Sequence, residues 1–129
     1  MPAIGTCRVL RPDPQSVDRP EEHHRATFSA SRQPDKTVVV TVSGEVDAAN
    51  SRALSDYVER QIAGCPQLVL DLSGVGFFGT AGFATLHHVN VICAQYRASW
   101  VLVVAPELRR FLKICDPDDI LPLADSVPH

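Results

Sequence analysis

The amino-acid sequence predicts a single α/β domain. We expect a mixed, mainly parallel sheet of about five strands with helices packed against it, in the order β-β-α-β-α-β-α-β. Three short apolar runs, Thr37–Val42, Gln67–Leu72 and Ser99–Ala105, have the length and composition of buried strands. Segments with helical apolar spacing separate and follow these runs. Buried strands that alternate with helices favour a parallel sheet with right-handed crossovers. A chain of 129 residues has room for one such core.

The N-terminal part of the chain predicts a leader followed by two antiparallel strands. Residues 1–22 contain four prolines and a charged second half, so we expect a loosely held leader and a folded domain at residues 23–126. Arg25–Ser31 alternates as a short edge strand does, and a Pro-Asp pair then favours a turn. The β-branched run Thr37–Val42 follows, and we expect that strand to end at Gly44.

The remaining segments predict three amphipathic helices and a closing strand. The first helix is expected at residues 48–63, the second after the glycine-rich stretch that follows Leu72, and the third from Pro106, since proline favours a first helical turn. A last edge strand is expected within residues 120–124. The side chains expected to face the core recur at helical spacing: Leu54, Tyr57, Val58 and Ile62 in the first helix, Phe83, Leu86, Val89, Cys93 and Tyr96 in the second, and Leu108, Phe111, Leu112 and Cys115 in the third.

The stretch "LVLDLSGVGFFGTAG" raises the question of nucleotide binding. Gly74, Gly76 and Gly79 have the spacing G-x-G-x-x-G behind an apolar run, as in a dinucleotide-binding loop. That fingerprint needs an acidic residue at the end of the next strand, and Val101–Ala105 is entirely apolar. A Gly-Lys-Ser/Thr phosphate loop is absent from the sequence. We therefore disfavour a nucleotide-binding enzyme, which stays the alternative from another functional class.

Composition and residue spacing also argue against catalysis, metal binding and nucleic-acid binding. A net charge of -3 without a basic cluster gives no reason to expect nucleic acid, and no apolar run reaches the length of a membrane helix. The four cysteines, Cys7, Cys65, Cys93 and Cys115, form no C-x-x-C pair, so we expect free thiols, with a redox disulfide as the alternative. We expect a cytoplasmic protein without cofactor or metal, and not an enzyme.

The end of the glycine-rich stretch predicts a protein-docking feature instead. Gly79, Thr80, Ala81 and Gly82 are small residues at an expected helix start, with Phe83 next to them. Small side chains let another backbone approach closely. A helix start also offers unpaired N–H groups and a positive dipole end to a partner's carboxylate or phosphate.

The pattern from Val38 to Leu123 resembles the STAS domain, and most closely the bacterial anti-sigma factor antagonists. Three stretches carry the resemblance: "VSGEVDAANS", "LVLDLSGVGFFGTAGFATL" and "ELRRFLKICDPDDILPL". The resemblance implies a single STAS domain that binds an anti-sigma factor, usually a serine kinase, and so releases a sigma factor. Membership in this family also leaves open a STAS subunit of another assembly, such as a lipid-transport complex or a signalling scaffold.

In such antagonists a switch-loop hydroxyl is phosphorylated, and this sequence departs from that pattern. The resemblance places Gly79 at the usual aspartate, Thr80 at the first hydroxyl and Ala81 at the residue normally phosphorylated. An alanine methyl group accepts no phosphoryl group, so we expect no switch there, with phosphorylation of Thr80 as the alternative. The predicted partner-binding residues are Asp47, Asn50, Gly79, Thr80, Ala81, Gly82 and Phe83.

Overall fold

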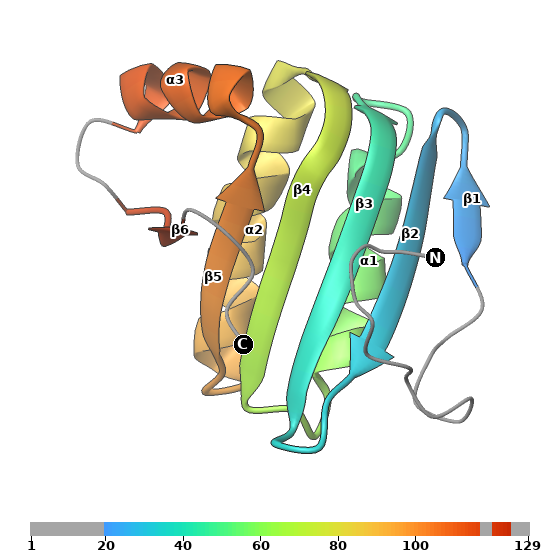
Figure 1. The fold of residues 1–129 in the computed structure, drawn as a ribbon, viewed down its shortest axis with the longest axis vertical. Helices are drawn as coiled ribbons and strands as arrows, with labels where there is room; N and C mark the ends of the chain where they lie inside the picture. The colour runs from blue at the N-terminus through green and yellow to red at the C-terminus, as the bar shows by residue number, and fades with distance from the viewer. Residues whose placement is uncertain (1–19, 117–119, 125–129) are drawn as a thin grey trace.

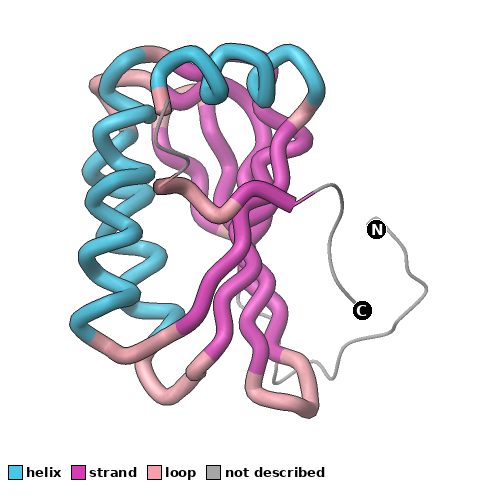
Figure 2. Tube along the Cα trace, turned by 90° about the vertical axis from the view of Figure 1, so that its left-hand side faces the viewer, coloured by secondary structure: helices cyan, strands magenta, loops and turns pink. Residues whose placement is uncertain are grey.

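A computed structural model of the chain describes residues 20–116 and 120–124. It contains one sheet with two helices on the same face and a third helix across one end (Figures 1 and 2). The elements follow in the order β1 (Glu21–His23), β2 (Ala26–Arg32), β3 (Thr37–Val46), α1 (Ser51–Ile62), β4 (Gln67–Phe78), α2 (Thr80–Gln95), β5 (Ser99–Val104), α3 (Pro106–Cys115) and β6 (Leu123–Ala124).

Within the described residues, the sheet has six strands in the order β1-β2-β3-β4-β5-β6. β1, β2 and β3 pair antiparallel, whereas β3 to β6 are all parallel. The predicted mixed, mainly parallel α/β fold is therefore confirmed. The strand that the sequence did not predict is β1, and its first two residues fall in the segment that was assigned to the leader. Most of that segment, residues 1–19 with Cys7, lies outside the described residues.

The core lies between the sheet and the pair of helices α1 and α2. Alternate residues of the central strands point to this side, so Val40 in β3, Leu70 in β4 and Leu102 in β5 are fully buried. On α1 the predicted inward residues are all buried, among them Tyr57, the largest fully buried side chain. The residues that recur every second position in the strands and at helical spacing in α1 therefore pack together in one core.

Two strands extend beyond their predicted ends. β3 does not stop at Gly44 but continues to Val46, and β4 continues past Leu72 to Phe78. Gly44 has φ 99°, and a Cβ there would overlap the carbonyl oxygen of Arg25, so glycine is required inside the strand. The β3–β4 register shifts on either side of this position, as it does at a β-bulge.

Two predicted inward residues are exposed instead. Tyr96 lies just after α2 ends and is 45% exposed, and Phe111 on α3 is 38% exposed beside Ile114 at 78%. α3 lies across the end of the sheet, so only Leu112 on this helix is fully buried. The closing strand forms only at Leu123–Ala124. Among the described residues, no helix is long and apolar enough to span a bilayer.

Candidate functional site

The predicted site residues gather where β3 and β4 end. These strands are parallel and Val46 pairs with Phe78, so both strands end at the same edge of the sheet. The backbone N–H of Gly79 donates to the carbonyl oxygen of Val46 at 2.9 Å, which fixes the start of α2 beside the turn after β3. We call residues 47–49, Phe77 and residues 79–84 the carboxyl-end surface.

The turn that leads into α1 is held by Asp47 and Asn50. Asp47 Oδ1 accepts a hydrogen bond from the N–H of Ala49 at 2.9 Å, and its carbonyl oxygen accepts one from the N–H of Ser51 at 3.0 Å. Asp47 remains half-buried, so part of its carboxylate side chain faces solvent. Its side chain closes the turn, while Asn50 occupies the N-cap position of α1 without a side-chain cap hydrogen bond.

Asn50 is fully buried, with 0% of its surface exposed. Its Nδ2 donates to the carbonyl oxygens of His23 at 3.1 Å and Glu45 at 2.8 Å, and its Oδ1 accepts from the N–H of Asp47 at 3.0 Å. The amide side chain thus makes all three of these hydrogen bonds to backbone groups of the same chain. Asn50 was predicted to bind a partner, but its position makes it a support of the turn.

Gly74 and Gly76 lie inside β4, although the sequence predicted that this strand would end at Leu72. Gly74 pairs with Ser43 of β3, and the ladder continues to the last residue of the strand. A dinucleotide fingerprint places its glycines in a turn between strand and helix, where the backbone wraps a pyrophosphate. Here only Gly79 separates β4 from α2, so the spacing G-x-G-x-x-G does not form that turn.

The start of α2 exposes some of its small residues and buries others. Gly79 is the N-cap, Thr80 is the first helical residue with an exposed side chain, and Ala81 is half-buried. Gly82 is buried, and a Cβ there would lie 2.8 Å from two atoms of the Phe78 ring. Gly82 therefore lets α2 pack closely on β4, and Thr80 and Ala81 remain accessible.

Aromatic residues flank this helix start. The sequence could not assign Phe77 and Phe78, and the structure separates them: Phe77 is 54% exposed, whereas Phe78 packs against the core. Phe83 is half-buried and meets the ring of His87 edge to face at 4.7 Å between centroids. An exposed phenyl ring thus lies next to an accessible helix N-terminus.

Charge near the helix start is sparse. The first turn of α2 contains no acidic residue, so the positive end of its dipole is not neutralised from within the helix.

In the part of the chain that the structure describes, no three His, Cys, Asp or Glu side chains are grouped as a metal site would require. Cys65, Cys93 and Cys115 are free thiols, and burial raises the pKa of Cys93 to about 11.

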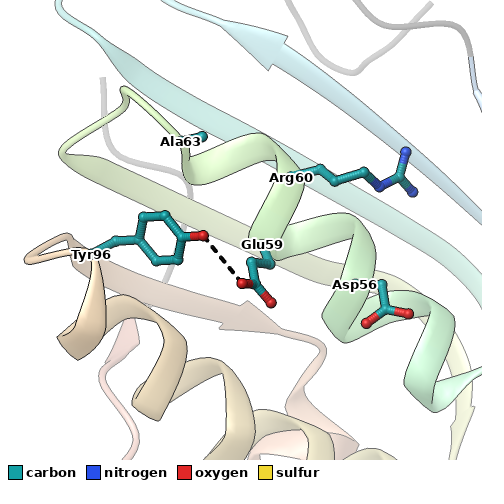
Figure 3. Close-up of a pocket in the computed structure, with 5 residues that line it drawn as sticks. All are labelled: Asp56, Glu59, Arg60, Ala63 and Tyr96. Atoms are coloured by element: carbon teal, nitrogen blue, oxygen red, sulfur yellow. Dashed lines mark hydrogen bonds between the residues drawn. The ribbon is translucent and has the colours of Figure 1, made fainter.

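A shallow hollow lies at the other end of the two helices (Figure 3). It is lined by Asp56, Glu59, Arg60, Ala63 and Tyr96. Tyr96 Oη donates to Glu59 Oε2 at 3.1 Å, and this bond raises the pKa of Tyr96. Tyr96 is 45% exposed, so this pair lies at the surface of the protein and not inside an enclosed cleft.

Comparisons with known proteins identify the family to which the chain belongs. A family model described as the STAS domain matches residues 29–129. Osmosensory protein A of Mycobacterium tuberculosis is 34% identical over 134 aligned residues, which cover 95% of this chain and 78% of that protein. Anti-sigma-F factor antagonist RsfA of the same species is 31% identical over 93 residues, covering 69% of this chain and 73% of that protein.

A solved structure shows the same relationship. The crystal structure of an anti-sigma factor antagonist from Mycobacterium paratuberculosis superposes with a TM-score of 0.63 at 27% identity, covering 91% of this chain and 92% of that one. The family match spans well over half of the chain, and it confirms the resemblance that the sequence suggested. The chain therefore belongs to the STAS domain family and groups with the bacterial anti-sigma factor antagonists.

Proposed function

We propose that this protein binds an anti-sigma factor through its carboxyl-end surface and thereby releases a sigma factor in the cytoplasm. The protein acts as a binding module without chemistry of its own. The observation that carries this proposal is the exposed, uncapped start of α2: Thr80 and Ala81 are accessible, and no acidic side chain lies in the first turn. This arrangement suits a partner's carboxylate and a closely approaching backbone.

Two neighbours give this helix start the features of a contact surface. Phe77 offers a large ring that is 54% exposed, and aromatic side chains are enriched in the cores of protein interfaces. Asp47 adds a half-buried carboxylate from the adjoining turn. The proposed contact consists of the backbone of Gly79 and the side chains of Asp47, Phe77, Thr80, Ala81 and Phe83. Asn50 and Gly82 support this contact from inside the fold.

Ala81 makes this contact constitutive in our proposal. Its methyl group cannot accept a phosphoryl group, so a kinase partner has no acceptor at the position where related antagonists carry a hydroxyl. Phosphorylation would otherwise add nearly two negative charges to the surface and disrupt binding. Thr80 is exposed one residue earlier, which makes it the acceptor to examine first if the protein is phosphorylated after all.

Binding measurements on a charge variant test the proposal. Ala81→Asp should weaken the affinity for the anti-sigma factor at least about tenfold, because the new carboxylate would neutralise the positive end of α2 and repel a partner's carboxylate. An acidic residue in the first turn stabilises a helix, so this loss cannot come from unfolding of α2. The matched control is Ala94→Asp, which places the same charge on an exposed position about 20 Å along the same helix. Equal affinity of Ala81→Asp and the parent would contradict the proposed surface.

The switch is tested separately by incubation with an anti-sigma factor kinase and ATP. We expect the mass of the parent protein to stay unchanged, and Ala81→Ser to gain one phosphate because the serine restores the acceptor. A stoichiometric phosphate on Thr80 of the parent would refute the constitutive contact.

A further inference from the structure

One buried side chain joins the N-terminal edge strand to the carboxyl-end surface. Asn50 donates to the carbonyl oxygen of His23 in β1 and to that of Glu45 in β3, and it accepts from the N–H of Asp47. The side chain is fully buried, so water cannot replace these partners while the fold is closed. One amide group therefore joins β1 to the segment from Glu45 to Asn50, which is distant from β1 in the sequence.

β1 itself is attached through few contacts. It has only three residues and lies at the edge of the sheet (Figure 1). Arg60 of α1 donates to both carboxylate oxygens of Glu21 at 3.1 Å, and His23 Nε2 lies 3.0 Å from the same carboxylate. The His23 ring also stacks on Phe28 with a centroid distance of 5.0 Å. A short edge strand with such partly exposed ties opens more easily than the central strands.

The connection continues from the turn to the start of α2. Asp47 follows directly on Val46, whose carbonyl oxygen accepts the N–H of Gly79. A second tie joins the two helices, because Thr85 Oγ1 donates to the carbonyl oxygen of Ser51 at 3.2 Å. The turn at Asp47 is thus connected to the start of α2 through the Val46–Asp47 peptide bond and the hydrogen bond between Gly79 and Val46.

We propose that Asn50 is a positioning residue that couples the attachment of β1 to the geometry of the carboxyl-end surface. When β1 is paired, His23 holds the Asn50 amide, and the amide holds the turn at Asp47. When β1 detaches, one buried donor loses its acceptor and the turn loosens. The effect on a partner rests on the proposed function, but the coupling itself is a property of the chain alone.

Amide hydrogen exchange on the full-length protein tests this coupling without any partner. Glu21→Gln removes the charge that Arg60 and His23 hold, and Glu22→Gln is the matched control because Glu22 is an exposed neighbour in the same strand. We expect Glu21→Gln to speed exchange about tenfold in β1 and also in residues 47–51 and 79–83, with β5 unchanged. The control should leave all of these segments as in the parent.

Asn50→Ala tests the coupling in the opposite direction. It should speed exchange in β1 as well as in residues 79–83, although neither segment contains the substitution. The proposal is overturned if, in either variant, β1 and the carboxyl-end surface do not change together, or if neither changes. A failure of Ala81→Asp to affect binding would contradict the proposed function and leave this coupling intact, so the two outcomes are distinguishable.

Discussion

Replacing Asn50 by alanine should destabilise the fold by about 3 kcal/mol. The substitution removes three hydrogen bonds of 2.8, 3.0 and 3.1 Å from a side chain that is fully buried. Each leaves a backbone group of His23, Glu45 or Asp47 without this partner, at about 1 kcal/mol apiece. No helix-cap bond is lost, since the Asn50 side chain makes none to α1. For a domain of this size about 4 °C per kcal/mol gives a fall in Tm of about 12 °C.

Urea unfolding followed by far-ultraviolet circular dichroism measures this cost. Asn90→Ala is the control, because Asn90 is only half-buried and accepts a single hydrogen bond, from Trp100 Nε1 at 3.0 Å. We expect the control to lose about 1 kcal/mol or less. If the free energy of unfolding of Asn50→Ala lies within about 0.5 kcal/mol of the parent's, the buried amide does not hold the turn and the reasoning is refuted.

Three further predictions follow from other parts of the fold. Gly82→Ala should destabilise the protein by about 1 kcal/mol or more in urea unfolding, although alanine favours helices, because its Cβ would push into the Phe78 ring. The hydrogen bonds from Arg60 hold the pKa of Glu21 below its ordinary value of 4.5. The ionised Glu21 therefore adds stability that is fully present above pH 4.5 and is lost as the pH falls through the lowered pKa. Measurements of the free energy of unfolding between about pH 6 and pH 3 should show this loss of stability, and the loss should be smaller in Glu21→Gln. Burial raises the pKa of Cys93 from 9.0 to about 11, which lowers its thiolate fraction about a hundredfold, so iodoacetamide should modify it slowly, as peptide mapping by mass would show.

Each of these predictions has a control. Gly76→Ala should leave stability almost unchanged, because the nearest atom to its Cβ would be 4.0 Å away, and equal losses at both glycines would contradict the packing argument. A Glu22→Gln variant should keep the acid-dependent loss of the parent. Cys115 is only half-buried, so it should react faster than Cys93, and equal rates would show that burial does not protect the latter.

The central strands and helices could be predicted because their patterns record burial on one side. Alternate residues of the run Thr37–Val42 and of its counterparts in β4 and β5 are apolar because helices cover that face, and the helical stripe of α1 matches its buried face. β1 could not be predicted, because the sequence of Glu21–His23 shows no strand pattern. This strand is held instead by its pairing with β2 and by the hydrogen bond from Arg60 to Glu21. Phe111 was misplaced because spacing reveals an apolar face but not whether a neighbour covers it.

The sequence indicated that small residues at the start of α2 would be accessible, but it did not indicate the structural role of each residue there. Small residues at a helix start pointed to Thr80 and Ala81, and both are accessible. The glycine spacing suggested a loop where β3 and β4 continue to pair, since sequence does not show ladder bonds across a bulge. Asp47 and Asn50 were both predicted to contact a partner, and the hydrogen bonds and burial of Asn50 place its side chain inside the fold.

The most direct test of the account is to map the contact by nuclear magnetic resonance. The labelled chain would be titrated with an anti-sigma factor while its backbone amide signals are followed. We predict that shifts and line broadening concentrate in residues 47–49, at Phe77 and in residues 79–84. Changes confined to the hollow at Glu59 and Tyr96, or to the exposed side of α3, would contradict the assignment of the carboxyl-end surface as the site of binding.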